Sequence, residues 1–158
     1  MAAAEAVKLT DDMQRVVLEQ RLGFHATVCP DGTPNLSPKG TTSVYDDEHL
    51  FFAEIRSPRT IENLRANPAI EVNVVDPIVR KGYRFKGTAT LHDGDDVHRR
   101  ALELLRERDY GDYEERLRLI VLIRVEHAEP LTSPAYDVGH TAEELAAQYL
   151  EHYRLLHG

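Results

Sequence analysis

The sequence has very few of the residues that build disulfide scaffolds and cysteine-based metal sites. Its 158 residues include one cysteine, Cys29, and no tryptophan. A single cysteine cannot form an internal disulfide or a zinc site of several thiolates. The eight histidines show no H-E-x-x-H pattern or other close pair at metal-ligand spacing. We therefore expect no metal site, and we interpret Cys29 as a structural residue.

Long apolar runs and an excess of basic residues are also missing. No stretch approaches the roughly 20 apolar residues that cross a bilayer. Residues 1–7 carry Glu5 and have no basic region of the kind that opens a signal peptide. Acidic residues outnumber basic ones by 27 to 19, which gives a net charge of −8. The sequence thus predicts a cytoplasmic protein that binds neither membranes nor nucleic acid.

What is present fits one globular domain, residues 1–158. Hydrophobic residues make up 42% of the chain and charged residues 29%, which is an ordinary globular composition. The charge is unevenly distributed, because the segment from Arg56 to Lys86 holds seven basic and only three acidic residues. A basic segment within an acidic chain indicates a site for a small anionic ligand.

Short extended segments separated by turn residues dominate the chain. Apolar runs and two-residue alternation predict strands at 24–29, 35–45, 50–55, 70–74, 82–91 and 117–125. Caps and helical periodicity predict helices at 10–21, 59–66, 95–108 and 141–157, the last being amphipathic and opened by a capping box. This pattern favours a mainly β fold with flanking helices, in which an antiparallel sheet closes into a small barrel. The run 120–123 is apolar on both faces, which predicts a central strand or one that packs against a partner.

A candidate anion site lies where an apolar strand leads into a helix at Ser57, Arg59 and Thr60. Free backbone N–H groups and the helix dipole favour an anion at a helix N-terminus. Arg59 adds a fork of donors, and the two hydroxyl groups add more. The alternative is that Ser57 only caps the helix and Arg59 is a solvated surface residue.

Two strand segments add weaker signals. Arg84 and Lys86 share one face of a predicted strand, so both can reach one phosphate, although a solvent-facing strand with scattered charge is the alternative. Residues 35–42 form an extended run that is rich in hydrogen-bonding groups and bent by Pro38 and Gly40. Such an irregular strand can bind a planar polar ring, and the alternative is a bulged edge strand.

Taken in order, four runs resemble the pyridoxamine 5′-phosphate oxidase-related family of FMN-binding split-barrel proteins. They are P-N-L-S-P-K-G from Pro34, L-F-F-A-E from Leu50, S-P-R-T-I-E-N-L from Ser57 and K-G-Y-R-F-K-G from Lys81. The resemblance implies a six-stranded antiparallel split β-barrel. It also implies a homodimer that holds FMN at its interface, so the apolar run 120–123 becomes a candidate dimer face.

The resemblance also assigns roles to residues. It implies that the phosphate is held by Ser57, Arg59 and Thr60, with Arg84 or Lys86 from the following strand. It implies that the isoalloxazine ring is lined by Ser37, Lys39, Gly40, Thr41 and Thr42. Backbone contacts along the ring and ribityl chain then come from Ala53, Glu54 and Ile55. Tyr83 and Tyr136 are candidates to cover the ring, and no residue is identified as a catalytic acid or base.

One departure argues against oxidation of pyridoxamine phosphate itself. The helix 141–157 stands where the true oxidase has a basic, substrate-gripping segment. We therefore predict an FMN-dependent oxidoreductase with a small-molecule substrate and NADH or NADPH as a possible electron donor. The alternatives are a non-catalytic FMN-binding or electron-transfer module, a haem-handling protein, a protein without a ligand, and a reductase that uses F420, with Arg80 and Lys81 near its anionic tail.

Overall fold

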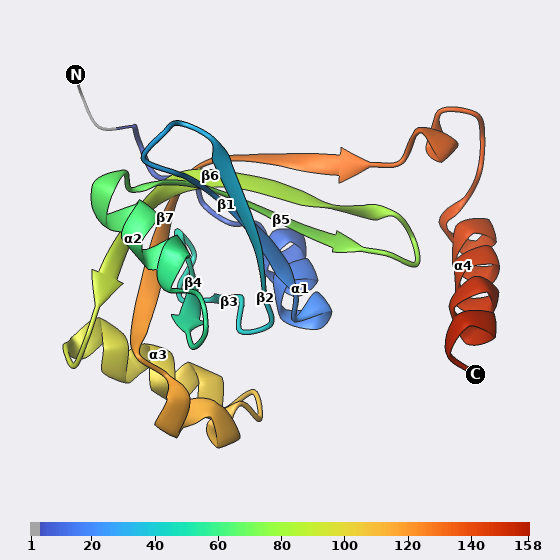
Figure 1. Cartoon of the computed structure of the whole chain (residues 1–158). Helices are drawn as coiled ribbons and strands as arrows, with labels where there is room; N and C mark the ends of the chain where they lie inside the picture. The colour runs from blue at the N-terminus through green and yellow to red at the C-terminus, as the bar shows by residue number, and fades with distance from the viewer. Residues whose placement is uncertain (1–3) are drawn as a thin grey trace.

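One antiparallel sheet dominates the computed structural model, which describes residues 4–158 (Figure 1). Its order is β2-β1-β5-β6-β7-β4-β3. The strands are β1 (Gly23–Val28), β2 (Pro34–Lys39), β3 (Ser43–Val44), β4 (His49–Glu54), β5 (Ala69–Asp76), β6 (Lys81–His92) and β7 (Leu119–Thr132). The predicted mainly β class is confirmed, with seven strands in place of six. The count differs because a turn at residues 40–42 divides the single extended segment predicted at 35–45.

In the described residues three α-helices pack against the sheet and a fourth, α4, stands apart from it, and most of the helix N-termini have the capping side chains that the sequence predicts. They are α1 (Asp11–Gln20), α2 (Pro58–Ala66), α3 (Asp96–Arg106) and α4 (Ala142–His157), with short 3-10 helices η1 (Gly111–Arg116) and η2 (Pro134–Tyr136). Thr10 accepts a hydrogen bond from the N–H of Met13 at the start of α1. Thr141 and Glu144 form the predicted capping box of α4.

The sheet curls because its two edge strands are consecutive in the chain. Only the turn at residues 40–42 separates β2 from β3. A three-residue connection keeps the two edges close, so the five strands between them must bend around the core. The Thr41 hydroxyl reinforces this closure, since it accepts from the N–H of Ala53 at 3.0 Å and donates to the Ala53 carbonyl at 3.3 Å.

Strand β7 is apolar on both faces because each face has its own cover. Val121 and Ile123 belong to the main core inside the curled sheet, with Phe52 and Phe85. Ile120 packs on the other side in a second cluster, with Ala101 and Leu105 of α3. Ile120, Val121 and Ile123 are therefore fully buried within one chain. A dimer contact through this run stays a prediction, and it would involve Leu122, which is only partly buried.

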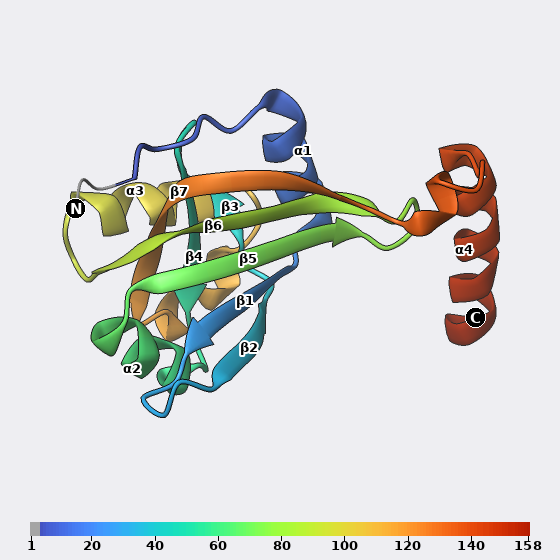
Figure 2. The ribbon, with the colours of Figure 1, turned by 90° about the horizontal axis from the view of Figure 1, so that it is seen from above.

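Strands β5, β6 and β7 continue together past the rest of the sheet, and β7 leads into η2 and α4, which lie away from the barrel (Figures 1 and 2). Arg80 stacks on the Tyr149 ring of α4 at 3.8 Å, and Lys81 lies 4.2 Å from the Tyr136 ring. The Tyr136 hydroxyl donates to the Val79 carbonyl at 2.6 Å. Among the described residues, no helix is both long enough and apolar enough to cross a membrane.

Candidate functional site

A groove of about 370 Å³ opens where β2, the end of β4 and η1 meet. This volume lies within the usual range of ligand sites, about 300–1,000 Å³. The groove is lined by Pro38, Lys39, Gly40, Thr41, Ala53, Ile55, Arg56, Ser57, Tyr110, Tyr113 and Arg116. Its walls therefore combine cations, hydroxyl groups and two aromatic rings, which suits a planar ligand that carries negative charge.

Lys39 is the most buried cation of the groove, with only 6% of its surface exposed. Its ammonium group donates to the Ser37 hydroxyl at 2.7 Å and also bonds to the Ser57 hydroxyl. It lies 5.5 Å from the centre of the Phe52 ring. Burial lowers the pKa of Lys39, and the nearby charge of Glu54 opposes that shift. The lysine thus holds a poorly hydrated positive charge at the groove wall.

The N-terminus of α2 forms the second donor group of the site. Ser57 occupies the cap position, but its side chain does not cap the helix and contacts Lys39 instead. The backbone N–H of Ser57 donates to the Glu54 carboxylate at 2.5 Å. Pro58 has no N–H, so the N–H groups of Arg59 and Thr60 are the first that α2 offers, and no acidic residue lies in its first turn. This end of the helix is therefore suited to an anion.

Hydrogen bonds from distant parts of the chain fix both α2 and the 40–42 turn. The Asn63 side chain of α2 donates to Thr27 of β1 at 3.0 Å, which anchors the helix to the sheet. Tyr110 donates its hydroxyl to the Gly40 carbonyl at 2.6 Å. The Arg108 guanidinium donates to the Leu18 carbonyl at 2.7 Å and to the Thr42 carbonyl at 3.3 Å. The groove is thus positioned by elements on three sides and does not depend on one loop.

His25 lies fully buried beneath the turn. Its Nε2 atom is 2.8 Å from the Thr42 hydroxyl, which itself donates to the Lys39 carbonyl at 2.7 Å. Because the hydroxyl proton is used in that bond, His25 must donate from Nε2, and its buried Nδ1 atom then has no partner. Burial lowers the pKa of His25 to about 3, and the charge of Lys39 adds to the shift. We infer that the imidazole is neutral at pH 7.

Six of the thirteen site residues that the sequence predicts line this groove. They are Lys39, Gly40, Thr41, Ala53, Ile55 and Ser57. The Ser37 hydroxyl accepts from the Lys39 ammonium group, and the Thr42 hydroxyl donates to the Lys39 carbonyl. The Glu54 carboxylate accepts from the Ser57 N–H. Arg59 and Thr60 begin α2 directly after Ser57; Arg59 is exposed and Thr60 is buried. Eleven of the thirteen predicted residues therefore lie in or beside one groove.

Arg84 and Lys86 are not in this group. The strand register places Asn73 opposite Arg84 and Glu71 opposite Lys86. Arg84 pairs with Glu71 at 2.8 Å and with Glu129 at 2.9 Å, and Lys86 pairs with Glu71 at 3.4 Å. The basic segment 56–86 is thus divided among separate surfaces, because its basic residues belong to α2, to β6 and to the connections that precede them. The role of Arg84 and Lys86 in phosphate binding stays a prediction, because within one chain both side chains are paired with carboxylates.

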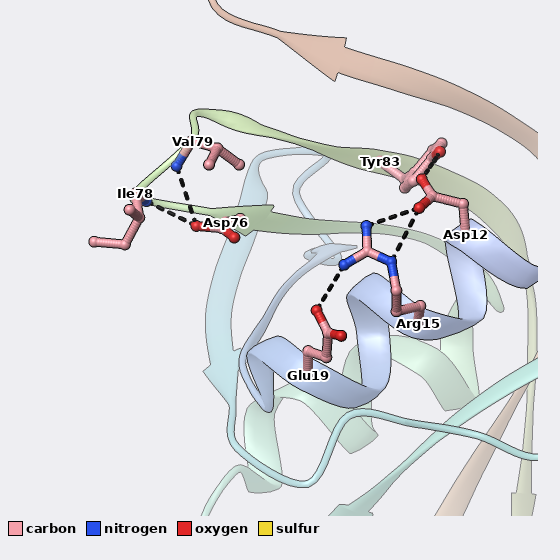
Figure 3. Close-up of polar contacts among 7 residues, drawn as sticks. All are labelled: Asp12, Arg15, Glu19, Asp76, Ile78, Val79 and Tyr83. Carbon is pink, nitrogen blue, oxygen red and sulfur yellow. Dashed lines mark hydrogen bonds and ion pairs between the residues drawn. The ribbon is translucent and has the colours of Figure 1, made fainter. Parts of the chain in front are cut away.

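The two tyrosines suggested as ring covers also lie elsewhere in the chain. The Tyr83 hydroxyl donates to Asp12 of α1 at 2.5 Å, next to the Arg15 and Glu19 ion pair (Figure 3). This bond lowers the pKa of Asp12. Tyr136 donates to the carbonyl of Val79. Val79 lies in the turn after Asp76, whose carboxylate accepts from the N–H groups of Ile78 at 2.8 Å and Val79 at 3.3 Å (Figure 3). Neither tyrosine lines the groove.

Sequence reasoning missed several residues of the groove, among them Arg56, Tyr110, Tyr113 and Arg116. Tyr110, Tyr113 and Arg116 come from residues 110–116, where no strand or helix pattern was recognised, and η1 folds this stretch over the groove. The spacing of two tyrosines and a pair of arginines just before the apolar β7 run was the available signal. Tyrosines and arginines at such spacing are also typical of ordinary exposed loops, so the spacing alone does not identify these residues as part of a groove.

Comparison with known proteins places these features in a family. The family model for pyridoxamine 5′-phosphate oxidase matches residues 9–136. The chain is 31% identical over 88 residues to the uncharacterized protein MJ0282 of Methanocaldococcus jannaschii. The aligned stretch covers 54% of this chain and 58% of that protein. It therefore spans somewhat more than half the length of that curated relative.

Solved structures share the fold. HupZ of Group A Streptococcus is 29% identical, with a TM-score of 0.69 over 79% of this chain and 95% of HupZ. An F420 reductase is 23% identical, with a TM-score of 0.60 over 77% of this chain and 98% of its own. An FMN-binding protein from Syntrophomonas wolfei and the heme storage protein HutZ from Vibrio cholerae, 12% and 18% identical, show the fold alone. With a match over most of its length, the chain belongs to the pyridoxamine 5′-phosphate oxidase family.

Proposed function

We propose that this protein binds FMN in the groove and acts as an oxidoreductase on a small-molecule substrate. The observation that carries the proposal is the pairing of a buried lysine with an uncapped helix N-terminus along one groove wall. Phosphate binding needs N–H donors and positive charge, and both are present at α2. The fold that the chain shares with an FMN-binding protein and an F420 reductase supports a flavin-type ligand.

The residues of the groove have distinct roles in this proposal. The N–H groups at the start of α2 and the Arg59 side chain hold the phosphate, while Lys39 places a positive charge beside the ring. Tyr110 and Tyr113 line one side of the groove and offer aromatic contacts to the ring. The bound flavin supplies hydride or electron transfer, and the chain binds and orients it. The homodimer implied by the family resemblance is part of the proposal, and light scattering tests it as a mass of two chains.

The experiment that tests the proposal is the absorption spectrum of the purified protein, followed by denaturation and identification of any released chromophore. Released FMN supports the proposal, and reduction of the bound flavin by NADH or NADPH supports the oxidoreductase role over a non-catalytic module. Release of F420 or haem, or a colourless protein that does not take up FMN, contradicts it.

Replacing Arg59 with alanine is expected to weaken FMN binding by about 1.5–3 kcal/mol, because a charge-assisted bond to phosphate is lost. Flavin fluorescence titration measures the affinity. Arg65→Ala is the matched control, since Arg65 is an exposed arginine in the last turn of the same helix. An affinity for FMN that is equally unchanged in both variants would remove Arg59 from the proposed site.

A further inference from the structure

The turn that joins β2 to β3 is held by side chains that bind its carbonyl groups. The Thr42 hydroxyl donates to the Lys39 carbonyl at 2.7 Å. The Tyr110 hydroxyl donates to the Gly40 carbonyl at 2.6 Å. The Arg108 guanidinium donates to the Thr42 carbonyl at 3.3 Å. Arg108 and Tyr110 lie 66 and 70 positions further along the chain than the carbonyls they bind, and we call this pair of residues the turn latch.

The same hydrogen bonds act on the N–H groups that the turn offers to a ligand. A carbonyl and the N–H of the next residue belong to one peptide group, so a hydrogen bond to the carbonyl polarises that N–H and strengthens it as a donor. The bond from Tyr110 therefore strengthens the N–H of Thr41. The bond from the Thr42 hydroxyl strengthens that of Gly40. Gly40 and Thr41 both line the groove, and in the described part of the chain neither N–H has a hydrogen-bond partner.

Arg108 is a half-buried cation whose hydrogen-bond partners among the described residues are all neutral oxygens. Its guanidinium donates to the carbonyls of Thr42 and Leu18 and to the Ser43 hydroxyl. Burial lowers the pKa of Arg108. A cation that leaves water without a carboxylate partner costs free energy. The contacts with the turn are therefore what holds Arg108 in place.

The end of α3 fixes the direction of both latch residues. Asp109 has a φ of +62°, and its N–H donates to the Arg106 carbonyl at 3.2 Å. The N–H of Tyr110 donates to the Leu105 carbonyl at 3.0 Å. These two bonds form a Schellman motif, in which the left-handed residue is usually a glycine. The backbone between Arg108 and Tyr110 is thus rigid, so the two side chains are directed at the turn before any ligand arrives.

We propose that Arg108 and Tyr110 are positioning residues for the ligand of the groove. They hold the turn in the conformation that presents the N–H groups of Gly40 and Thr41 to an acceptor edge of a planar ring. Polarised N–H groups favour an oxygen or nitrogen atom that carries negative charge. This inference rests on the proposed function and adds to it the device that sets affinity for the ring. The end of α3 controls that affinity through the turn.

Tyr110→Phe tests the latch, because it keeps the aromatic ring and removes only the hydroxyl. In the ligand-free protein, the amide nitrogen resonance of Thr41 is expected to move, since it responds to hydrogen bonding at the preceding carbonyl. Affinity for FMN is expected to fall about fivefold, as for the loss of one hydrogen bond. Tyr45→Phe is the control, because Tyr45 is also partly buried, packs against the Phe51 ring and does not line the groove.

Arg108→Gln is expected to weaken FMN binding about tenfold, because it removes a charged donor from the turn. Arg108→Lys keeps the charge without the fork and is expected to recover part of the affinity. Arg100→Gln is expected to leave the affinity unchanged, since Arg100 is an exposed arginine of α3 paired with Glu103. Each latch variant is expected to lose the same factor for riboflavin as for FMN, because the turn binds the ring and α2 binds the phosphate.

The outcomes separate the latch from the proposed function. An unmoved Thr41 resonance in Tyr110→Phe overturns the inference, and so does a loss of affinity for FMN that riboflavin does not share. Equal losses in Arg108→Gln and Arg100→Gln also overturn it. A parent protein that binds neither FMN nor riboflavin contradicts the proposed function, while a moved Thr41 resonance still supports the latch.

Discussion

Lowering the pH from 7 to 4 is expected to destabilise the protein by about 3 kcal/mol through His25 alone. The folded-state pKa of His25 is about 3, below its ordinary value of 6.5, because burial penalises the imidazolium ion. Between these two values the unfolded chain binds more protons than the folded one. The stabilising contribution is therefore complete above pH 6.5 and is lost as the pH falls toward 3.

Urea unfolding at pH 7 and at pH 4 measures this effect. His25→Gln is the comparison, because glutamine can still donate to the Thr42 hydroxyl but does not titrate. Acidic groups such as Asp31 and Asp95, whose pKa values are also lowered, contribute equally in both proteins. A difference in pH dependence between the parent protein and His25→Gln is therefore due to the titration of His25. Identical pH dependence in the two proteins would show that the folded protein accepts the imidazolium ion.

Replacing Gly87 with alanine is expected to lower the free energy of unfolding by about 3 kcal/mol or more, or to prevent folding. Gly87 follows a register shift in the β6–β7 pairing. A Cβ atom there would overlap the carbonyl oxygen of Arg124 and lie 2.9 Å from its carbonyl carbon. Backbone atoms of a central strand cannot move aside as a flexible side chain can, so the pairing itself must open.

Gly111→Ala is the matched control, since nothing lies within 4 Å of a Cβ atom at Gly111. Its stability is expected to stay within about 0.5 kcal/mol of the parent, as for most surface substitutions. Thermal and urea unfolding of both variants measure the difference. Equal stability of Gly87→Ala and Gly111→Ala would show that the central pairing can relax around an added methyl group.

Local chemistry was enough to predict most elements of the fold. A turn joins β1 to β2 at the Pro30-Asp31-Gly32 sequence, which favours one, with Gly32 at a φ of +82°, a conformation that glycine adopts without strain. The capping residues Thr10 and Thr141 begin their helices as expected. These signals succeed because a cap or a turn depends on residues within a few positions of each other.

Long-range pairing decides the surroundings of two features that the sequence brought to notice. Alternation correctly placed Arg84 and Lys86 on one face of a strand, but only the register of β5 and β7 brought Glu71 and Glu129 to them. The sequence predicts β7 to be a central strand or a partner surface, and only the tertiary structure shows that α3 of the same chain packs on its Ile120. In each case the neighbour that decides the role lies far away in sequence.

By itself the sequence determined the strands, the helix ends, the family and the core of the candidate site at Lys39 and Ser57. The strands and helix ends follow from local periodicity and capping. The family and the role of Lys39 follow from the resemblance of four short runs to known relatives. Only the tertiary structure decided which cations remain unpaired and where they gather. The closure of the sheet brings η1 over the groove and places Arg116 and Arg118 beside Arg56. Charge at a site depends on distances through space, and strand register sets those distances.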